Sequence, residues 1–270
     1  MSLDTSNLRR VAGASAAVVT ALQVGTAVVG VRAGRRDYAD GVWGPGLAAV
    51  ALTGAVAGNG DPARRWALAA ATTGWAARLG KVMADRLRGT DEEDARYSEF
   101  LEGDSVPAVV AKVFGTQAVA QLLVSVPLQV AAASRLPRGP RAWLFPAGVT
   151  LMVVGAVVEA TADRQKAAFM AQKSAAKERG EETPDVLDTG LWGWSRHPNY
   201  FGDSLVWDGA WLAAAASAPA AWTFPAPLAM SYFLVYATGA KRTERRMQDR
   251  PAYRDYQQRV SFFVPLPPKR

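Results

Sequence analysis

Long stretches of the sequence carry no charged residue, and they constrain the fold more than any other feature. Four of them cover residues 11–31, 113–133, 142–158 and 209–240. A helix of about 20 apolar residues is long enough to cross the hydrocarbon core of a bilayer. None of these stretches alternates apolar and polar residues as a half-buried strand does. We therefore expect an all-α integral membrane protein.

The apolar segments and the breaks between them predict about seven transmembrane helices. The stretch 209–240 is too long for one crossing, and Ala-Pro-Ala-Ala at 218–221 predicts a tight hairpin within it. All seven helices would belong to a single membrane domain over residues 1–270. The helices are expected at about 11–31, 42–58, 64–84, 107–133, 141–163, 203–217 and 221–240.

The positions of lysine and arginine predict which ends of these helices face the cytoplasm. With the N-terminus outside and the C-terminus cytoplasmic, the cytoplasmic segments hold 23 of these residues and the opposite segments hold 7. This asymmetry is typical of membrane proteins. The charged segment 171–186 is expected to be a cytoplasmic loop. Because topology accounts for the net charge of +7, we expect the lipid bilayer as partner and no nucleic acid. The expected location is the cell membrane, with several crossings.

The composition excludes several classes of site. The chain has no cysteine and a single histidine, His197. Disulfides, thiolate nucleophiles and the HExxH zinc site are therefore excluded, and we expect no metal. Neither of the common glycine-rich phosphate loops, GxGxxG and GxxxxGK[ST], occurs in the sequence.

A first polar cluster lies at the end of the helix expected over 141–163. Glu159, Asp163 and Lys166 follow one another at spacings of four and three, so they share one helix face. Ionisable groups at membrane depth usually face an interior cavity, which favours a functional face. The alternative is that the helix simply leaves the membrane here.

A second cluster lies in GWSRHPNYFGD at 193–203. Pro198 predicts a turn before a new helix, and Asn199 is expected to cap that helix. Arg196 and the helix N-terminus could bind a phosphate, and Trp192 and Tyr200 offer flat faces for a ring. An interfacial loop with membrane-belt tryptophans explains the pattern equally well. The remaining polar members are His197 and Asp203.

A third cluster lies in the basic tail after residue 240. Glu244 stands among four basic residues, and Tyr253 and Tyr256 follow at a helical spacing. The cluster could cover an anionic cofactor. Basic residues after a last crossing are also ordinary topological signals.

Three segments together resemble the steroid 5-alpha-reductase family, in its C-terminal domain. They are EATADRQKAAF at 159–169, LDTGLWGWSRHPNYFGDSLVW at 187–207 and YRDYQQRVSFFVPLPP at 253–268. The chain resembles more closely the uncharacterised bacterial membrane proteins allied to that family, which also have a loop similar to RGTDEEDARYSEF at 88–100. The resemblance covers roughly 75–270.

The resemblance implies an NADPH-dependent reductase of an activated carbon–carbon double bond in a steroid-like or other lipid substrate. In that family the cofactor lies among the last three helices, so residues from about 141 to 270 would form the cofactor-binding half. Asp203 or Tyr200 would supply the acid, with Tyr97 as a further candidate. The expected cofactor-binding residues are Glu159, Asp163, Lys166, Trp192, Arg196, His197, Asn199, Glu244, Tyr253 and Tyr256.

Two positions depart from the family pattern, and two other functions remain open. Met170 replaces a basic residue, so contact with the cofactor's 2′-phosphate would fall to residues such as Arg164 or Lys173, and Asp208 stands where the relatives often have tryptophan. The first alternative is an S-adenosylmethionine-dependent methyltransferase of the isoprenylcysteine or phospholipid type, since these enzymes carry a similar turn. The second is a lipid-binding membrane protein without enzymatic activity.

Overall fold

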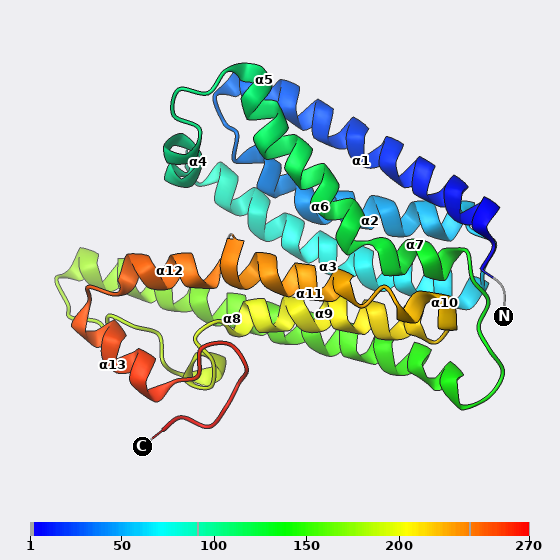
Figure 1. Cartoon of the computed structure of the whole chain (residues 1–270). Helices are drawn as coiled ribbons and strands as arrows, with labels where there is room; N and C mark the ends of the chain where they lie inside the picture. Colours follow the sequence, from blue (N-terminus) through cyan, green and yellow to red (C-terminus); the bar gives the residue numbers. More distant parts are fainter. Residues whose placement is uncertain (1–2, 91, 238, 270) are drawn as a thin grey trace. The chain divides into compact units, whose positions relative to one another are not determined.

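The computed structural model describes residues 3–90, 92–237 and 239–269, and these residues form helices and loops without a strand (Figure 1). The expectation of an all-helical fold is thereby confirmed for the described residues. The helices are α1 (Thr5–Ala33), α2 (Tyr38–Ala57), α3 (Pro62–Arg88), α4 (Ala95–Phe100), α5 (Val106–Val109), α6 (Thr116–Val124), α7 (Val126–Ala132), α8 (Leu144–Arg179), α9 (Pro198–Ala215), α10 (Ala218–Ala221), α11 (Pro225–Tyr232), α12 (Ala240–Met247) and α13 (Pro251–Arg259).

Three helical segments among the described residues are long and apolar enough to cross a membrane. They are Thr5–Ala33, Val106–Val124 and Pro140–Arg179. On α1 the side chains of Val24 and Val29 are more than half exposed although the helix buries its opposite face. A helix that is apolar on both faces is typical of a membrane or of a large core. The expected number of seven crossings and the orientation of the termini stay predictions.

Several helix ends differ from those expected. The helix expected to end near 163 continues to Arg179, so most of the predicted loop at 171–186 is helical instead. Alanine, lysine and glutamate in this segment are strong helix formers, and Gly180, at φ +70°, follows the helix end. The helix expected over 107–133 contains a π-helical stretch at Val110–Gly115 and is interrupted at Ser125, which α7 follows.

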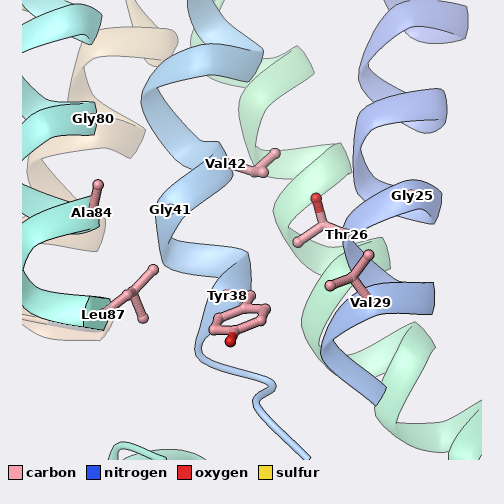
Figure 2. Close-up of a pocket in the computed structure, with 9 residues that line it drawn as sticks. All are labelled: Gly25, Thr26, Val29, Tyr38, Gly41, Val42, Gly80, Ala84 and Leu87. Carbon is pink, nitrogen blue, oxygen red and sulfur yellow. The ribbon is translucent and has the colours of Figure 1, made fainter. Parts of the chain in front are cut away.

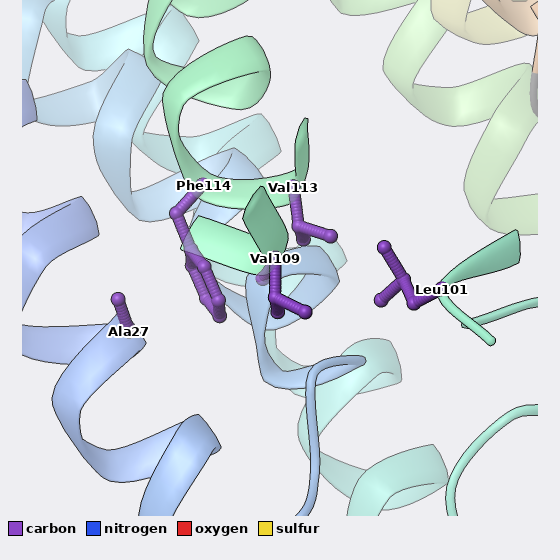
Figure 3. Packing of buried hydrophobic residues seen from close by; sticks show 6 residues of the cluster. Ala27, Leu101, Val109, Val113 and Phe114 are labelled. Atoms are coloured by element: carbon purple, nitrogen blue, oxygen red, sulfur yellow. The ribbon is translucent and has the colours of Figure 1, made fainter. Parts of the chain in front are cut away.

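The structure divides into two compact units. Unit 1 comprises the residues up to 149 together with 210–226, and unit 2 comprises 150–209 together with the residues from 227. In unit 1, α2 packs against both α1 and α3. A buried apolar cluster joins α1 to the segment around α5 through residues that include Ala27, Leu101 and Phe114 (Figure 3).

Arg64 is completely buried in the first turn of α3. Its guanidinium donates to the carbonyl oxygens of Ala131 at 2.8 Å and Ser134 at 2.6 Å, and to the hydroxyl of Ser217 at 3.0 Å. A buried charge is tolerated only where hydrogen bonds replace water. Arg64 therefore closes the C-terminal end of α7, whose last carbonyls have no partner within the helix.

Gln121 of α6 binds the backbone of α2 beside a proline. Pro45 lies inside α2 and cannot donate to the preceding turn. The side-chain amide of Gln121 donates to the carbonyl oxygens of Val42 at 3.0 Å and Trp43 at 2.9 Å. Gly46 makes this approach possible, because a Cβ there would overlap the Gln121 amide.

In unit 2, helices α8 and α9 cross through two glycines. A Cβ built on Gly202 of α9 would lie 2.6 Å from the backbone nitrogen of Glu159 on α8, and a Cβ on Gly155 would lie 2.6 Å from the carbonyl oxygen of Gly202. The backbones are therefore close enough to fix the two helices against each other. This crossing places Glu159, which is 4% exposed, at the contact.

Candidate functional site

The three polar clusters of the sequence come together within unit 2. The first lies on α8, the second in the turn before α9, and the third on α12 and α13 with the segment that follows. Each contact described below joins residues of this unit, apart from that of Tyr97 in unit 1.

The turn at 190–193 is held on α8 by two hydrogen bonds. The indole nitrogen of Trp192 donates to the carbonyl oxygen of Ala162 at 3.0 Å, and the backbone nitrogen of Leu191 donates to the side chain of Gln165 at 3.0 Å. Gly190, at φ +60°, lets the chain approach Gln165 so closely that a Cβ would clash. The ammonium of Lys166 lies 6.0 Å from the Trp192 ring. The predicted aromatic face and the predicted cation are thus neighbours.

Asn199 joins the turn to the first cluster. Helix α9 begins at Pro198, so Asn199 lies inside its first turn, and the expected cap on this helix is absent. The amide of Asn199 instead donates to the carboxylate of Asp163 at 3.2 Å. His197 takes the place before the helix, and its carbonyl oxygen accepts from the backbone nitrogen of Phe201. Asp163 and Asn199 therefore fix the start of α9 on α8.

Arg196 binds the tail of the chain. Its Nε donates to Glu244 Oε1 at 2.6 Å and its Nη2 to Oε2 at 3.2 Å. Its Nη1 donates to the carbonyl oxygens of Gln257 at 2.9 Å and Val260 at 2.6 Å. The bidentate geometry expected for a phosphate is thus given to a carboxylate of the chain itself.

His197 lies beside the same carboxylate and is 3% exposed. Its Nε2 is 3.3 Å from Glu244 Oε1. The ring stacks on Tyr200 with centroids 5.8 Å apart, and Phe262 meets its face edge-on at 5.3 Å. Burial alone would raise the pKa of Glu244, but hydrogen bonds from His197 and Arg196 outweigh it and lower the pKa to about 2. Glu244 is therefore ionised at neutral pH.

The two tail tyrosines are buried, and Tyr256 holds α13 on the turn at 190–193. The hydroxyl of Tyr256 donates to the carbonyl oxygen of Trp192 at 2.6 Å. Burial raises the pKa of both Tyr253 and Tyr256, and the nearby carboxylate of Glu244 raises that of Tyr253 further. Both phenols stay protonated, and that of Tyr256 serves as a hydrogen-bond donor to the turn.

The two residues expected to supply an acid lie in the first turns of α9. Asp203 is 5% exposed and belongs to the buried side of the helix that also carries Ser204. Tyr200 is half-buried, and a Cβ on Gly239 would press against its ring. The further candidate, Tyr97, lies in unit 1, where its hydroxyl donates to Asp40 at 2.7 Å.

Sequence reasoning missed three residues of this arrangement. Gln257 donates to Glu244 Oε2 at 3.1 Å, Phe262 lies against both Arg196 and His197, and the hydroxyl of Ser195 donates to the carbonyl oxygen of Phe263 at 2.7 Å. The spacing of these residues carries no signal of a site. Only the return of the tail onto the turn brings them together.

The sequence profile of one protein family matches residues 27–260. The chain belongs to this family, which is described as "Protein of unknown function (DUF1295)". The match includes α8, the turn, α9, α12 and α13, while Phe262 and Phe263 follow its end. No curated protein and no solved structure matches the chain.

Proposed function

We propose that this chain is a membrane-embedded, NADPH-dependent reductase of an activated carbon–carbon double bond in a steroid-like or other lipid substrate. It would cross the cell membrane about seven times, with its N-terminus outside and its C-terminus cytoplasmic. The observation that supports the proposal most is the convergence of the three clusters in unit 2, since the resemblance to steroid 5-alpha-reductases rests on the same three segments.

The residues of unit 2 suit a nicotinamide dinucleotide. Trp192 and Tyr200 offer flat faces, and Lys166 is an exposed cation beside one of them. Arg164 is a second exposed cation on α8. Because Arg196 and His197 are engaged with Glu244, their proposed role is to hold the wall of the site, while Lys166 and Arg164 bind phosphate.

When bound, NADPH supplies a hydride. The chain would orient the substrate and supply the proton. Asp203, buried on α9, is the proposed proton donor, with Tyr200 as the other candidate. Apolar helices would exclude water from the reacting bond and admit the lipid substrate from the bilayer.

The test is a titration of the purified, detergent-solubilised protein with NADPH, NADH and S-adenosylmethionine, read as a shift in thermal unfolding. A ligand that binds only the folded state raises the Tm. NADPH is expected to raise the Tm, and Lys166→Ala to weaken its binding about tenfold, a typical loss for one charged contact of about 1.4 kcal/mol. The matched control is Lys177→Ala, because Lys177 is also exposed on α8.

Either of two results would overturn the proposal. A shift with S-adenosylmethionine alone would move the protein to the methyltransferase class. An absence of any shift, in a protein that unfolds cooperatively, would favour a protein without a nucleotide site. A successful titration would justify a screen of enone substrates.

A further inference from the structure

Unit 1 contains an apolar cavity of about 360 Å³ that is separate from the clusters of unit 2 (Figure 2). Its walls are formed by Gly25 and Val29 of α1 and by Gly80 and Ala84 of α3, with Gly41 of α2 between them. The hydroxyl of Thr26 also lines the cavity, but it donates to a carbonyl of its own helix. The volume falls within the range of about 300–1,000 Å³ that is common for small-molecule sites.

Two of the cavity's glycines leave space that no neighbour fills. A Cβ built on Gly25 or on Gly80 would meet nothing within 4 Å. By contrast, a Cβ on Gly44 or Gly54 of α2 would touch Ala76 or Ala132, so those glycines serve helix packing. Val29 at the edge of the cavity is 56% exposed. The cavity therefore opens at the outer surface of the helices.

Two arginines stand at one end of this cavity. Arg32 follows Val29 by three residues and Arg88 follows Ala84 by four, so each lies one turn beyond a lining residue on the same helix face. Both side chains are exposed, and the described residues provide no ion pair for either. Three other arginines at this end are already paired with acids: Arg35 with Asp37, Arg36 with Glu93 and Arg86 with Asp94.

We infer that this cavity binds the apolar tail of an anionic phospholipid, whose phosphate is held by Arg32 and Arg88. The inference rests on the membrane placement proposed above but not on the reductase activity. Arginines at the ends of apolar helices attract anionic lipid headgroups. A second copy of the chain suits the cavity less, because a twofold axis parallel to the helices would gather the arginines of both copies at the same end of the contact.

The test is native mass spectrometry of the detergent-solubilised protein titrated with phosphatidylglycerol and, separately, with phosphatidylcholine. The unmodified protein is expected to bind one phosphatidylglycerol more tightly than phosphatidylcholine. Arg32→Gln and Arg88→Gln should each weaken phosphatidylglycerol about fivefold, which corresponds to about 1 kcal/mol per arginine, and should weaken phosphatidylcholine less, because its choline cation offsets the charge of its phosphate. The control is Arg9→Gln, at the opposite end of α1.

Filling the cavity supplies the second arm of the test. Gly80→Leu adds a side chain where space is open and favours the helix, so it should fold normally and weaken both lipids at least tenfold. Gly74→Leu on the same helix, also in open space but outside the cavity, should change neither. Unchanged lipid binding in Gly80→Leu would overturn the inference, as would a dimer that Gly80→Leu dissociates. Retention of lipid by Lys166→Ala separates this site from the proposed cofactor site.

Discussion

Arg196 and Glu244 form a bidentate ion pair across 48 residues of sequence, with nitrogen–oxygen distances of 2.6 and 3.2 Å. The pair joins the turn before α9 to α12, and Nη1 of the same guanidinium holds the end of α13 through two carbonyls. One side chain therefore binds two separate parts of the tail. This arrangement explains why a basic tail that could be mobile in water is folded back on the turn.

The first prediction concerns this ion pair. Arg196→Lys keeps the charge but loses the planar fork, so it should lower the free energy of unfolding by about 1.5–3 kcal/mol. The measurement is chemical denaturation, together with hydrogen exchange of residues 240–260. Exchange should rise in the tail and stay slow in α1. Arg245→Lys, which changes an exposed arginine on the same short helix as Glu244, is the control. Tail protection equal to that of the unmodified protein would contradict the role of Arg196.

The second prediction is a pH dependence. Glu244 has a pKa lowered from 4.5 to about 2 in the folded protein, so its contribution to stability is fully present above about pH 4.5 and is lost as the pH falls toward 2. Glu244→Gln should therefore be less stable at pH 7, and the difference should shrink between about pH 4.5 and 2. Denaturation curves across this range measure it. The control is Glu182→Gln, which changes an exposed acid of the loop. Its free energy of unfolding should follow that of the unmodified protein at every pH.

The third prediction tests the proposed proton donor. Asp203→Asn preserves shape and removes the acid, so turnover of a reducible enone should fall about 10²–10⁴-fold while the affinity for NADPH changes little. Steady-state kinetics and the thermal-shift titration measure the two quantities separately. Equal losses in both would assign Asp203 to binding instead. Asp255→Asn, an exposed acid in α13, should affect neither.

The fourth prediction links the helix crossing to the site. Gly202→Ala places a methyl group 2.6 Å from the backbone of Glu159, so α8 and α9 must move apart. We expect a loss of about 1–3 kcal/mol in unfolding free energy and a weaker thermal shift with NADPH. Gly74→Ala, where a Cβ meets nothing, should instead stabilise by about 0.5–1 kcal/mol. A neutral Gly202→Ala would show that the crossing is not close-packed in solution.

The fifth prediction concerns the buried guanidinium of Arg64. Arg64→Met has a similar volume but removes the guanidinium that donates to the carbonyls of Ala131 and Ser134. The expected loss is about 1–3 kcal/mol, as for buried polar groups that lose a hydrogen-bond partner. Thermal unfolding in detergent measures it. Arg138→Met changes an exposed arginine of the following loop and should shift the Tm little.

Much of the fold could be predicted from the absence of charge. The uncharged run at 11–31 gave a helix at the right place because only a helix satisfies a long apolar backbone without partners. The end of α8 could not be found in this way. Its last turns are polar, and charge alone does not distinguish a solvated helix from a loop. The segment AQKSAAKER is rich in good helix formers, and this composition indicates a helix where the hydropathy does not.

The candidate site could be predicted in its parts but not in its connections. Spacing placed Glu159, Asp163 and Lys166 on one face, and Pro198 marked the turn. The partner of Arg196 could not be deduced, because Glu244 lies 48 residues away among four basic residues that look equally ready to pair. Carbonyl acceptors such as those of Gln257 and Val260 cannot be recognised in a sequence, because every residue has a backbone carbonyl.

The bond between Gln121 and α2 sets an order on biosynthesis. The donor for the carbonyl of Val42 is encoded 79 residues later. At about 5–20 residues per second, roughly 4–16 s pass between the synthesis of Val42 and that of Gln121. During that interval α2 lacks the contact that Gln121 makes beside its proline. This contact between α6 and α2 therefore forms only after α6 has emerged, and a nascent chain arrested before Gln121 would lack it.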